Sequence, residues 1–354
     1  MKLLYFSGTA GAGKTAIALG VGLLLQEKGL KIGFFKPLGL ERSPTRRDDN
    51  DVALMREIFK IPFSSETISP VKINPYYLTP AFLKEDARLL NRLDKALESF
   101  GRQEYDFLLI EGAVHPFAGA VQELDDFSLA ARWKASVLLI ASPDKDYYLD
   151  QLLLFQRTWD SLGANILGCV FNKISRPQLD KTRGIYKPLV ERRKIDVLGI
   201  IPCRPEIASP TVGELQGVLE GEVLAAPEQM HRLVEEIVIG TMTMESALGY
   251  LRRAPNKALI TGGDRSDLAL TALETSTSVI ILTGGLYPDV RVLSKAEEKG
   301  VPVILVQQDT YSTVESLHRV YRRIHPHNGE AVNLIKSNIN EHVDWGKIYE
   351  FATS

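Results

Sequence analysis

The chain of 354 residues has the length of two domains, and its apolar content of 45% and charged content of 24% are ordinary for a globular protein. A formal net charge of −2 excludes the strongly basic surface typical of proteins that bind nucleic acid or anionic membranes. The two cysteines, Cys169 and Cys203, fit neither a disulfide framework nor a metal motif. We therefore expect two reduced thiols in a cytoplasmic protein. No apolar run approaches the roughly 18 residues that span a bilayer.

Short apolar runs alternate with helical patterns from Met1 to about Pro205, which predicts a doubly wound, parallel α/β sheet. Ligands bind such sheets beyond the carboxyl ends of the strands, so residues that follow a strand are candidate site residues. Helical spacing predicts a helix over Pro80–Phe100, and the prolines between Ser64 and Pro80 predict an irregular segment before it. The predicted strands are Leu3–Phe6, Ile32–Phe35, Phe107–Ile110, Ser136–Ala141, Ile166–Phe171 and Val197–Ile201.

A glycine-rich loop follows the first predicted strand and precedes a predicted helix over Thr15–Glu27. Its sequence from Gly8 to Thr15 matches the phosphate-binding pattern G-x-x-x-x-G-K-[ST] without a mismatch. Backbone N–H groups and the helix N-terminus would cradle a triphosphate, Lys14 would reach the β- and γ-phosphates, and Thr15 would ligate Mg²⁺. The residues predicted to bind the nucleotide here are Gly8, Thr9, Gly11, Ala12, Gly13, Lys14, Thr15 and Ala16.

Two further strand ends supply charged candidates. Lys36 follows the second predicted strand, where it either faces the ligand crevice or is an ordinary surface lysine, and its position alone favours neither. Glu111 ends the apolar run Phe107–Ile110, where the acid of phosphate-loop proteins reaches Mg²⁺ directly or through water. The charged loop over residues 41–51, which ends at Asp51, offers more carboxylates that could meet the metal ion.

The strand Ile166–Phe171 ends in Asn172-Lys173-Ile174-Ser175. A guanine-specific site would have N-K-x-D at this point, and Ser175 replaces the aspartate that would bind the guanine ring edge. The motif therefore favours adenine over guanine, although an asparagine at a strand end also serves to complete a turn.

Prolines around Ala208–Thr211 mark a domain boundary. Beyond it we predict a helical stretch at Glu228–Ile237 and then three strand–turn–helix units that form a small parallel sheet. Two Thr-Gly-Gly turns at one edge of that sheet indicate either a nucleotide-sized anion site or tight turns that simply need glycine, and the two interpretations are equal. The three strands are Lys257–Gly263, Val279–Gly285 and Val301–Val306, followed by helix Thr313–Arg323, surface residues His325 and His327, and a terminal helix near Trp345–Phe351.

With these motifs in view, residues 1 to about 205 resemble the dethiobiotin synthetase-like branch of phosphate-loop ATPases, which includes cobyrinic acid a,c-diamide synthase. Residues near 210–325 resemble a DRTGG domain, and the two in this order are similar to the N-terminal region of long-form phosphotransacetylases. The segments that carry the resemblance are Gly8–Thr15, Phe35-Lys36-Pro37, Asn50–Ala53, Ile110–Ala113, Phe171-Asn172-Lys173, Leu198–Pro202, Pro210–Leu215, Ile260–Arg265 and Asp309-Thr310-Tyr311.

The resemblance implies an ATP-binding domain over residues 1–207, a DRTGG domain over 208–325 and a C-terminal tail helix over 326–354. It implies that Thr15, Asp51 and Glu111 surround Mg²⁺, that Lys14 and Lys36 face the transferred phosphate and the substrate, and that Asn172 touches adenine. The catalytic candidates are therefore Lys14, Lys36 and Glu111. The resemblance also implies assembly to a homodimer or a higher homo-oligomer.

Departures from these relatives argue against their reactions. Val114-His115 stand where dethiobiotin synthetases have Gly-Gly, neither cysteine lies in a glutaminase domain, and no acyltransferase domain follows, so we expect no acetyl transfer by this chain alone. The altered loop and the appended domain favour a regulatory module, in which Mg-ATP and a small ligand are sensed and a partner enzyme responds. The alternative hypothesis is an ATP-dependent ligase that phosphorylates a small carboxylate or carbamate.

Overall fold

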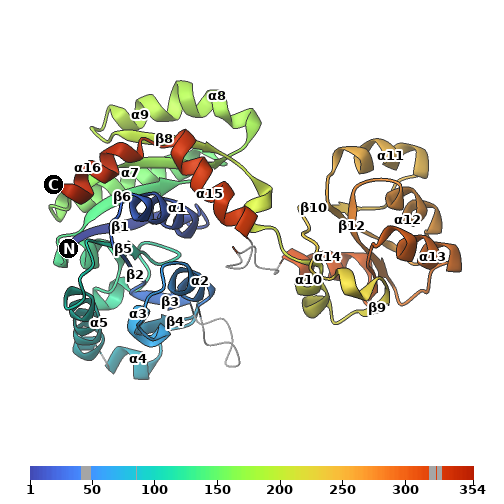
Figure 1. Cartoon of the computed structure of the whole chain (residues 1–354), viewed down its shortest axis with the longest axis horizontal. Helices are drawn as coiled ribbons and strands as arrows, with labels where there is room; N and C mark the ends of the chain where they lie inside the picture. The colour runs from blue at the N-terminus through green and yellow to red at the C-terminus, as the bar shows by residue number, and fades with distance from the viewer. Residues whose placement is uncertain (41–48, 85, 319–323, 325–328) are drawn as a thin grey trace. The chain divides into compact units, whose positions relative to one another are not determined.

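The computed structural model describes residues 1–40, 49–84, 86–318, 324 and 329–354, and the chain divides into two compact units (Figure 1). Unit 1 comprises Met1–Arg204 together with Ile324–Ser354, and unit 2 comprises Pro205–Arg323. Residues 326–354 were predicted as a separate tail helix, and in the structure the segment Ile324–Ser354 groups with unit 1. Most of the charged loop, residues 41–48, and both His325 and His327 lie outside the described residues.

Unit 1 is built on a six-stranded sheet with the strand order β2-β5-β1-β6-β7-β8, in which every neighbouring pair is parallel. The central strands are apolar and buried on both faces, as a sheet covered by helices requires. This confirms the predicted doubly wound α/β class and its six strands. The strands are β1 (Lys2–Gly8), β2 (Ile32–Phe35), β5 (Phe107–Glu111), β6 (Ser136–Ala141), β7 (Ile166–Ile174) and β8 (Val197–Pro202).

The helices of unit 1 connect these strands, and a small two-stranded parallel sheet of β3 (Leu38–Leu40) and β4 (Val71–Ile73) accompanies them. The segment predicted as irregular contains α3 and β4, and the helix predicted over Pro80–Phe100 is described as the two helices α4 and α5. The helices are α1 (Lys14–Glu27), α2 (Asn50–Ile58), α3 (Ser65–Ile68), α4 (Pro80–Lys84), α5 (Asp86–Gly101), α6 (Asp126–Arg132), α7 (Asp146–Ser161), α8 (Leu179–Lys181) and α9 (Lys187–Glu191).

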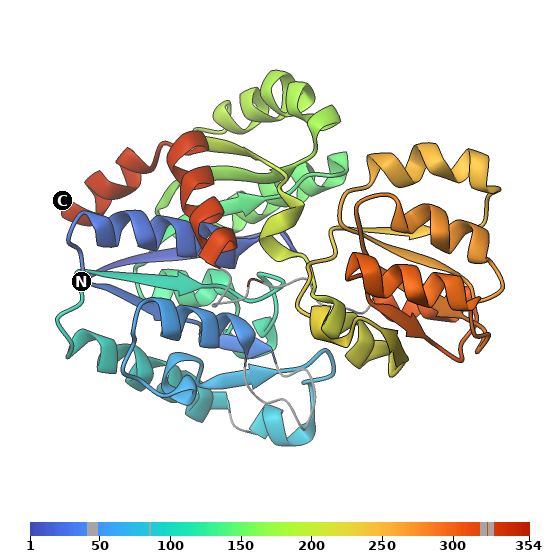
Figure 2. The ribbon, with the colours of Figure 1, turned by 45° about the vertical axis from the view of Figure 1, so that its right-hand side comes forward.

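Two C-terminal helices complete unit 1, and Figures 1 and 2 show the first of them, α15 (Gly329–His342), alongside α1. The contact is close because Gly20 of α1 has no side chain: a Cβ there would lie 2.4 Å from Cγ1 of Ile339 and 3.1 Å from Cγ2 of Ile335. Lys336 of α15 also donates to Glu27 at the end of α1, at 2.6 Å. The helix predicted near the C-terminus is confirmed as α16 (Trp345–Thr353).

Unit 2 has its own five-stranded sheet with the order β10-β11-β12-β13-β9. The three predicted strands are confirmed, but the sheet is mixed because β9, which the sequence analysis missed, pairs antiparallel with β13. The helix predicted at Glu228–Ile237 is wrong, since that segment contains a short 3-10 turn and the start of β10, which pairs in parallel with β11. The strands are β9 (Glu222–Ala225), β10 (Glu236–Ile239), β11 (Lys257–Gly262), β12 (Thr277–Thr283) and β13 (Val303–Leu305).

Among the described residues of unit 2, five α-helices cover this second sheet. The first begins with a capping box, in which the Thr211 side chain accepts from the backbone N–H of Glu214 and the Glu214 carboxylate accepts from that of Thr211. Across the described part of the chain, no helix is long and apolar enough to cross a bilayer. The helices are α10 (Val212–Leu219), α11 (Met244–Arg253), α12 (Ser266–Leu273), α13 (Val290–Lys299) and α14 (Thr310–His318), the last beginning three residues before the predicted Thr313.

Candidate functional site

The glycine-rich loop joins β1 to α1 at the carboxyl edge of the first sheet. Gly8 has φ 151°, and a Cβ at this residue would lie 1.8 Å from the carbonyl oxygen of Ile140, so only glycine fits there. Gly11 and Gly13 have φ values of 69° and 84°, which glycine adopts without steric cost. The loop thus turns directly into α1, whose first N–H groups have no partner within the helix and are free to meet an anion.

Neighbouring strand ends hold this loop in place. The Thr9 N–H donates to Ile140 at the end of β6 at 3.0 Å, and the Thr9 hydroxyl accepts from the N–H of Ser142 at 3.3 Å. From the end of β7, the Asn172 amide donates to the carbonyl of Ala12 at 2.8 Å. Thr9 and Asn172 therefore support the loop from within the protein, and their contact with a nucleotide stays a prediction.

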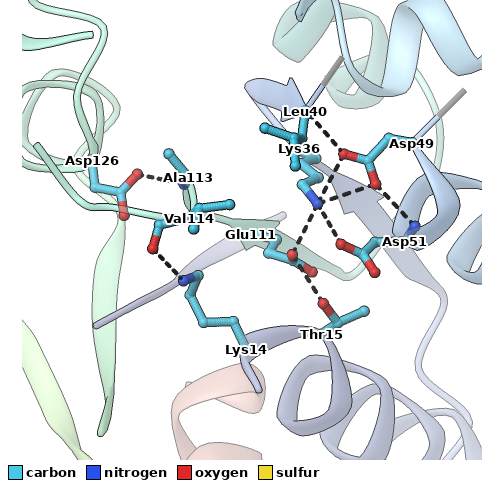
Figure 3. A network of polar contacts seen from close by, with 10 residues as sticks. All are labelled: Lys14, Thr15, Lys36, Leu40, Asp49, Asp51, Glu111, Ala113, Val114 and Asp126. Carbon is cyan, nitrogen blue, oxygen red and sulfur yellow. Dashed lines mark hydrogen bonds and ion pairs between the residues drawn. The ribbon is translucent and has the colours of Figure 1, made fainter. Parts of the chain in front are cut away.

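A cluster of opposite charges lies beside the loop (Figure 3). The ammonium group of Lys36, only 5% exposed, lies 3.0 Å from Oδ2 of Asp49, 2.6 Å from Oδ2 of Asp51 and 3.2 Å from Oε1 of Glu111. Burial alone would lower the pKa of Lys36, but the charges of Asp51, Glu111 and Asp49 raise it well above its ordinary value. The Lys36 side chain therefore carries a positive charge among three carboxylates.

The fold explains why these groups meet. β2 and β5 pair in parallel with Phe35 opposite Ile110, so the next residues, Lys36 and Glu111, leave the same edge of the sheet side by side. Asp49 is the N-cap of α2 and accepts from the backbone N–H groups of Asp51 and Leu40, at 2.9 and 3.1 Å. The capping interaction fixes the start of α2 and with it both aspartates of the cluster.

Glu111 connects the charge cluster to the phosphate loop. Its Oε1 accepts a hydrogen bond from the Thr15 hydroxyl at 3.1 Å, whereas its Oε2 is buried and has no hydrogen-bond partner among the described residues. Burial raises the pKa of Glu111 to about 7 despite the attraction of Lys36. A buried carboxylate oxygen without a partner is costly, and a cation would satisfy it.

The donor set fits Mg²⁺, which prefers the hard oxygens of hydroxyl and carboxylate groups. Thr15, Asp51 and Glu111 supply such oxygens, and Oε2 of Glu111 has no hydrogen-bond partner in the part of the chain that the structure describes. In the described ranges, no set of three or more acidic, histidine or cysteine side chains is arranged to hold a metal ion by itself. Mg²⁺ usually takes one or two carboxylates from the protein and completes its coordination with substrate phosphates and water.

On the other side of the loop, Lys14 is held beside a second buried acid. Its ammonium donates to the carbonyl of Val114 at 3.4 Å, and burial lowers its pKa. Val114 follows Ala113, whose N–H donates to Asp126 at 2.9 Å. Asp126 also accepts from the hydroxyls of Ser7 and Tyr5, and burial raises its pKa to about 7.

The structure therefore brings together the predicted residues Lys14, Thr15, Lys36, Asp51 and Glu111. Asp49 was predicted only as one of the carboxylates of the charged loop over residues 41–51, and Asp126 was not predicted. Asp49 carried a usable signal, since an acid at the start of a predicted helix is a common N-cap. No sequence signal pointed to Asp126, because it does not follow a strand and reaches the site only through the path that the chain takes after β5.

Comparison with protein-family models matches residues 3–211 to an AAA domain family, AAA_26, and residues 214–320 to the DRTGG domain. Among curated proteins, the chain is 26% identical to the phosphate acetyltransferase of Nitratidesulfovibrio vulgaris, with 96% of this chain and 50% of that protein covered. It is 21% identical to the phosphate acetyltransferase of Escherichia coli K12, with 97% and 52% covered. The chain thus spans about half the length of the curated relatives it matches.

Among solved structures, the MinD cell division protein of Aquifex aeolicus matches with a TM-score of 0.38 and 16% identity, covering 58% of this chain and 84% of that one. The CBS and DRTGG domains of the regulatory region of Clostridium perfringens pyrophosphatase match with a TM-score of 0.30 and 18% identity, covering 39% and 62%. The family match and the phosphate loop indicate nucleotide binding. The chain belongs to the AAA_26 family of AAA domains, carries a DRTGG domain after it, and is a distant match to the N-terminal half of phosphate acetyltransferases.

Proposed function

We propose that this chain is a nucleotide-responsive regulatory module. Unit 1 binds Mg-ATP, unit 2 binds a small ligand, and a partner enzyme responds to the bound state. The observation that carries the proposal is the phosphate loop with the residues around it: Lys14 begins α1, and Thr15 is hydrogen-bonded to Glu111, whose buried Oε2 has no hydrogen-bond partner among the described residues.

The residues of unit 1 take the following roles in this proposal. The backbone N–H groups at the start of α1 and the Lys14 ammonium bind the phosphates, and Thr15, Asp51 and Glu111 hold Mg²⁺. The bound metal ion would neutralise phosphate charge. The preference for ATP rests on Ser175, which stands where a guanine-specific site has aspartate.

The regulatory part of the proposal rests on the second domain and on the relatives. Coupling between two ligands requires two sites with different affinities in two states, and the two domains provide places for two sites. The curated relatives, of which this chain spans about half, are named phosphate acetyltransferase. An acyltransferase of that kind is therefore the partner enzyme to test first.

A second candidate is an ATP-dependent ligase, and the observation that favours it is Lys36. A buried ammonium at the carboxyl edge of β2, next to Glu111, is placed where it could face a carboxylate or carbamate that accepts the γ-phosphate. In the structure this ammonium is already engaged by three carboxylates, which is why we prefer the regulatory module.

The experiment measures ATP binding and ADP release with and without a pool of small carboxylic acids and amines. We expect Mg-dependent ATP binding and no stimulated turnover. Lys14→Ala should weaken ATP binding about tenfold or more, because hydrogen bonds to charged groups contribute about 1.5–3 kcal/mol. Lys95→Ala, at an exposed position of α5, is the matched control and should bind ATP like the wild type.

Each outcome decides between the candidates. If ADP release depends on one of the added acids, the ligase hypothesis replaces the hypothesis of a regulatory module. Absence of ATP binding to the wild-type chain would overturn both.

A further inference from the structure

The ammonium group of Lys36 lies among three carboxylates of unit 1 (Figure 3). It is within 3.2 Å of oxygens from Asp49, Asp51 and Glu111, which belong to the N-cap of α2, its first turn and the end of β5. Three carboxylates this close would repel one another strongly in a buried site. Lys36 therefore holds together three acids that have separate positions in the chain.

These carboxylates include the two that the proposed function assigns to Mg²⁺. Mg²⁺ binds its oxygen ligands at about 2.0–2.1 Å, so an ion on Asp51 and Glu111 would lie within a few ångströms of an ammonium that contacts the same side chains. Two positive charges at that separation repel strongly where water is excluded. The ammonium in its present position and a divalent cation on these oxygens exclude each other.

We infer that Lys36 is a resident counter-ion that occupies the acidic cluster in the nucleotide-free protein and has to leave it when a divalent cation enters. Away from the carboxylates, the buried ammonium needs another negative group, and the phosphates of a nucleotide are one. The divalent cation and the nucleotide are thereby made to bind together, because either alone leaves a charge unpaired. This inference rests on the proposed binding of a Mg-nucleotide to unit 1 and adds a specific role for Lys36.

The test measures divalent-cation binding in the absence of nucleotide. Mn²⁺ is the probe, because it accepts the same carboxylate and hydroxyl ligands as Mg²⁺ and its free fraction is measured by electron paramagnetic resonance. We expect the wild-type chain to bind Mn²⁺ weakly and Lys36→Met to bind it at least about tenfold more tightly, since the competing charge is gone. Adding a non-hydrolysable ATP analogue should tighten Mn²⁺ binding much more in the wild type than in Lys36→Met.

Two further variants test whether the loss of Lys36 itself, rather than a change in net charge or folding, alters the Mn²⁺ affinity. Lys36→Met leaves three uncompensated carboxylates, so Lys36→Met/Asp49→Asn removes one acid with the lysine, keeps the net charge, and retains Thr15, Asp51 and Glu111. Asparagine is as good an N-cap as aspartate, so α2 should keep its start. This double variant should also bind Mn²⁺ more tightly than the wild type.

Lys14→Met is the control for overall charge, because Lys14 lies near the cluster but donates to the carbonyl of Val114 rather than to a carboxylate. It should raise Mn²⁺ affinity much less than Lys36→Met does. An equal rise of Mn²⁺ affinity in Lys14→Met and Lys36→Met would show that net charge alone explains the effect, and it would overturn the inference. So would unchanged Mn²⁺ affinity in both Lys36 variants.

The inference and the proposed function fail in different ways. If the wild-type chain binds no ATP, the proposed function falls, yet the nucleotide-free Mn²⁺ measurement still shows whether Lys36 blocks the acids. If ATP binds and the Lys36 variants gain no Mn²⁺ affinity, the proposed function stands and the counter-ion role falls.

Discussion

At the scale of single residues, Asp126 shows how burial and hydrogen bonding act in opposite directions on one acid. The carboxylate accepts from Ser7, Tyr5 and the N–H of Ala113, which favours its charged form, yet burial dominates and raises its pKa to about 7. Its unfolded-state value is near 3.8. Between these two values the folded chain binds more protons than the unfolded chain, so this group lowers stability as the pH rises from about 4 to about 7.

Asp126→Asn removes that titration. We expect the free energy of unfolding of the variant, measured relative to the wild type, to increase with pH between 4 and 7 by at most about 1.4 kcal/mol per pH unit. Urea unfolding followed by tryptophan fluorescence at several pH values gives this difference. A constant offset from the altered hydrogen bonds does not change its slope, and parallel curves for the two proteins would contradict the prediction.

The residue scale also shows how much of the site the sequence predicts. Lys36 and Glu111 were placed at one edge because parallel strands end together, and their 3.2 Å contact follows from the pairing of Phe35 with Ile110. The glycine pattern also predicted the conformation of the phosphate loop, because a Cβ at Gly8 would clash with Ile140 and because Gly11 and Gly13 have positive φ values. Asp126 could not be predicted, because its contact with Ala113 depends on the path of the intervening loop rather than on any local pattern.

At the scale of elements, the pairing of α1 with α15 depends on the small size of Gly20. Glycine inside a helix usually costs about 0.5–1 kcal/mol relative to alanine, so Gly→Ala normally stabilises. Here the added Cβ would lie 2.4 Å from Cγ1 of Ile339 and 3.2 Å from the carbonyl oxygen of Ile335. The two helices would have to separate, and overpacking of this kind costs about 1–3 kcal/mol.

We therefore expect Gly20→Ala to lower the thermal stability of unit 1. Gly217→Ala in α10 is the matched control, because a Cβ there meets no atom of the described residues within 4 Å, and it should stabilise unit 2 slightly. Combining Gly20→Ala with Ile339→Ala should cost less than the sum of the two single changes. Stabilisation by Gly20→Ala alone would contradict the observed packing of α1 on α15.

Elements also differ in how far the sequence determines them. The long central strands were predicted because continuous short apolar runs are typical of strands buried on both faces in a doubly wound fold. β10 was mistaken for a helix because its four residues, Glu236–Ile239, have exposed Ile237 and Ile239 and gain their conformation from pairing with β11. The conformation of a short edge strand of this kind depends more on the strand with which it pairs than on its own sequence.

At the scale of the whole molecule, unit 2 is inserted between β8 and α15 of unit 1. The predicted boundary near residue 208 lies close to Pro205, where unit 2 begins. A helix pattern alone does not tell which core will cover the apolar face of a helix. The buried residues of α15, which include Ile335 and Ile339, belong to unit 1. Residues 1–204 are therefore an incomplete unit without the last segment of the chain.

Two truncations test this division. Residues 205–323 expressed alone should unfold cooperatively, because their described part contains three buried apolar clusters packed on the second sheet. Deletion of residues 324–354 should lower the transition of unit 1 by about 10 °C or more, since several buried apolar side chains at about 2 kcal/mol each are lost. Scanning calorimetry measures both, and an unchanged transition of unit 1 after the deletion would contradict the assignment of α15.

The return of α15 to unit 1 also sets an order of events during translation. Unit 2 is contiguous in sequence, so all of its residues leave the ribosome before unit 1 is complete, although unit 1 begins first. At about 5–20 residues per second, the segment over residues 205–354 takes roughly 8 to 30 seconds to synthesise. For that interval the nascent phosphate-loop unit exposes the face of α1 around Gly20 that α15 later covers, and this is when it is most open to chaperones and to aggregation.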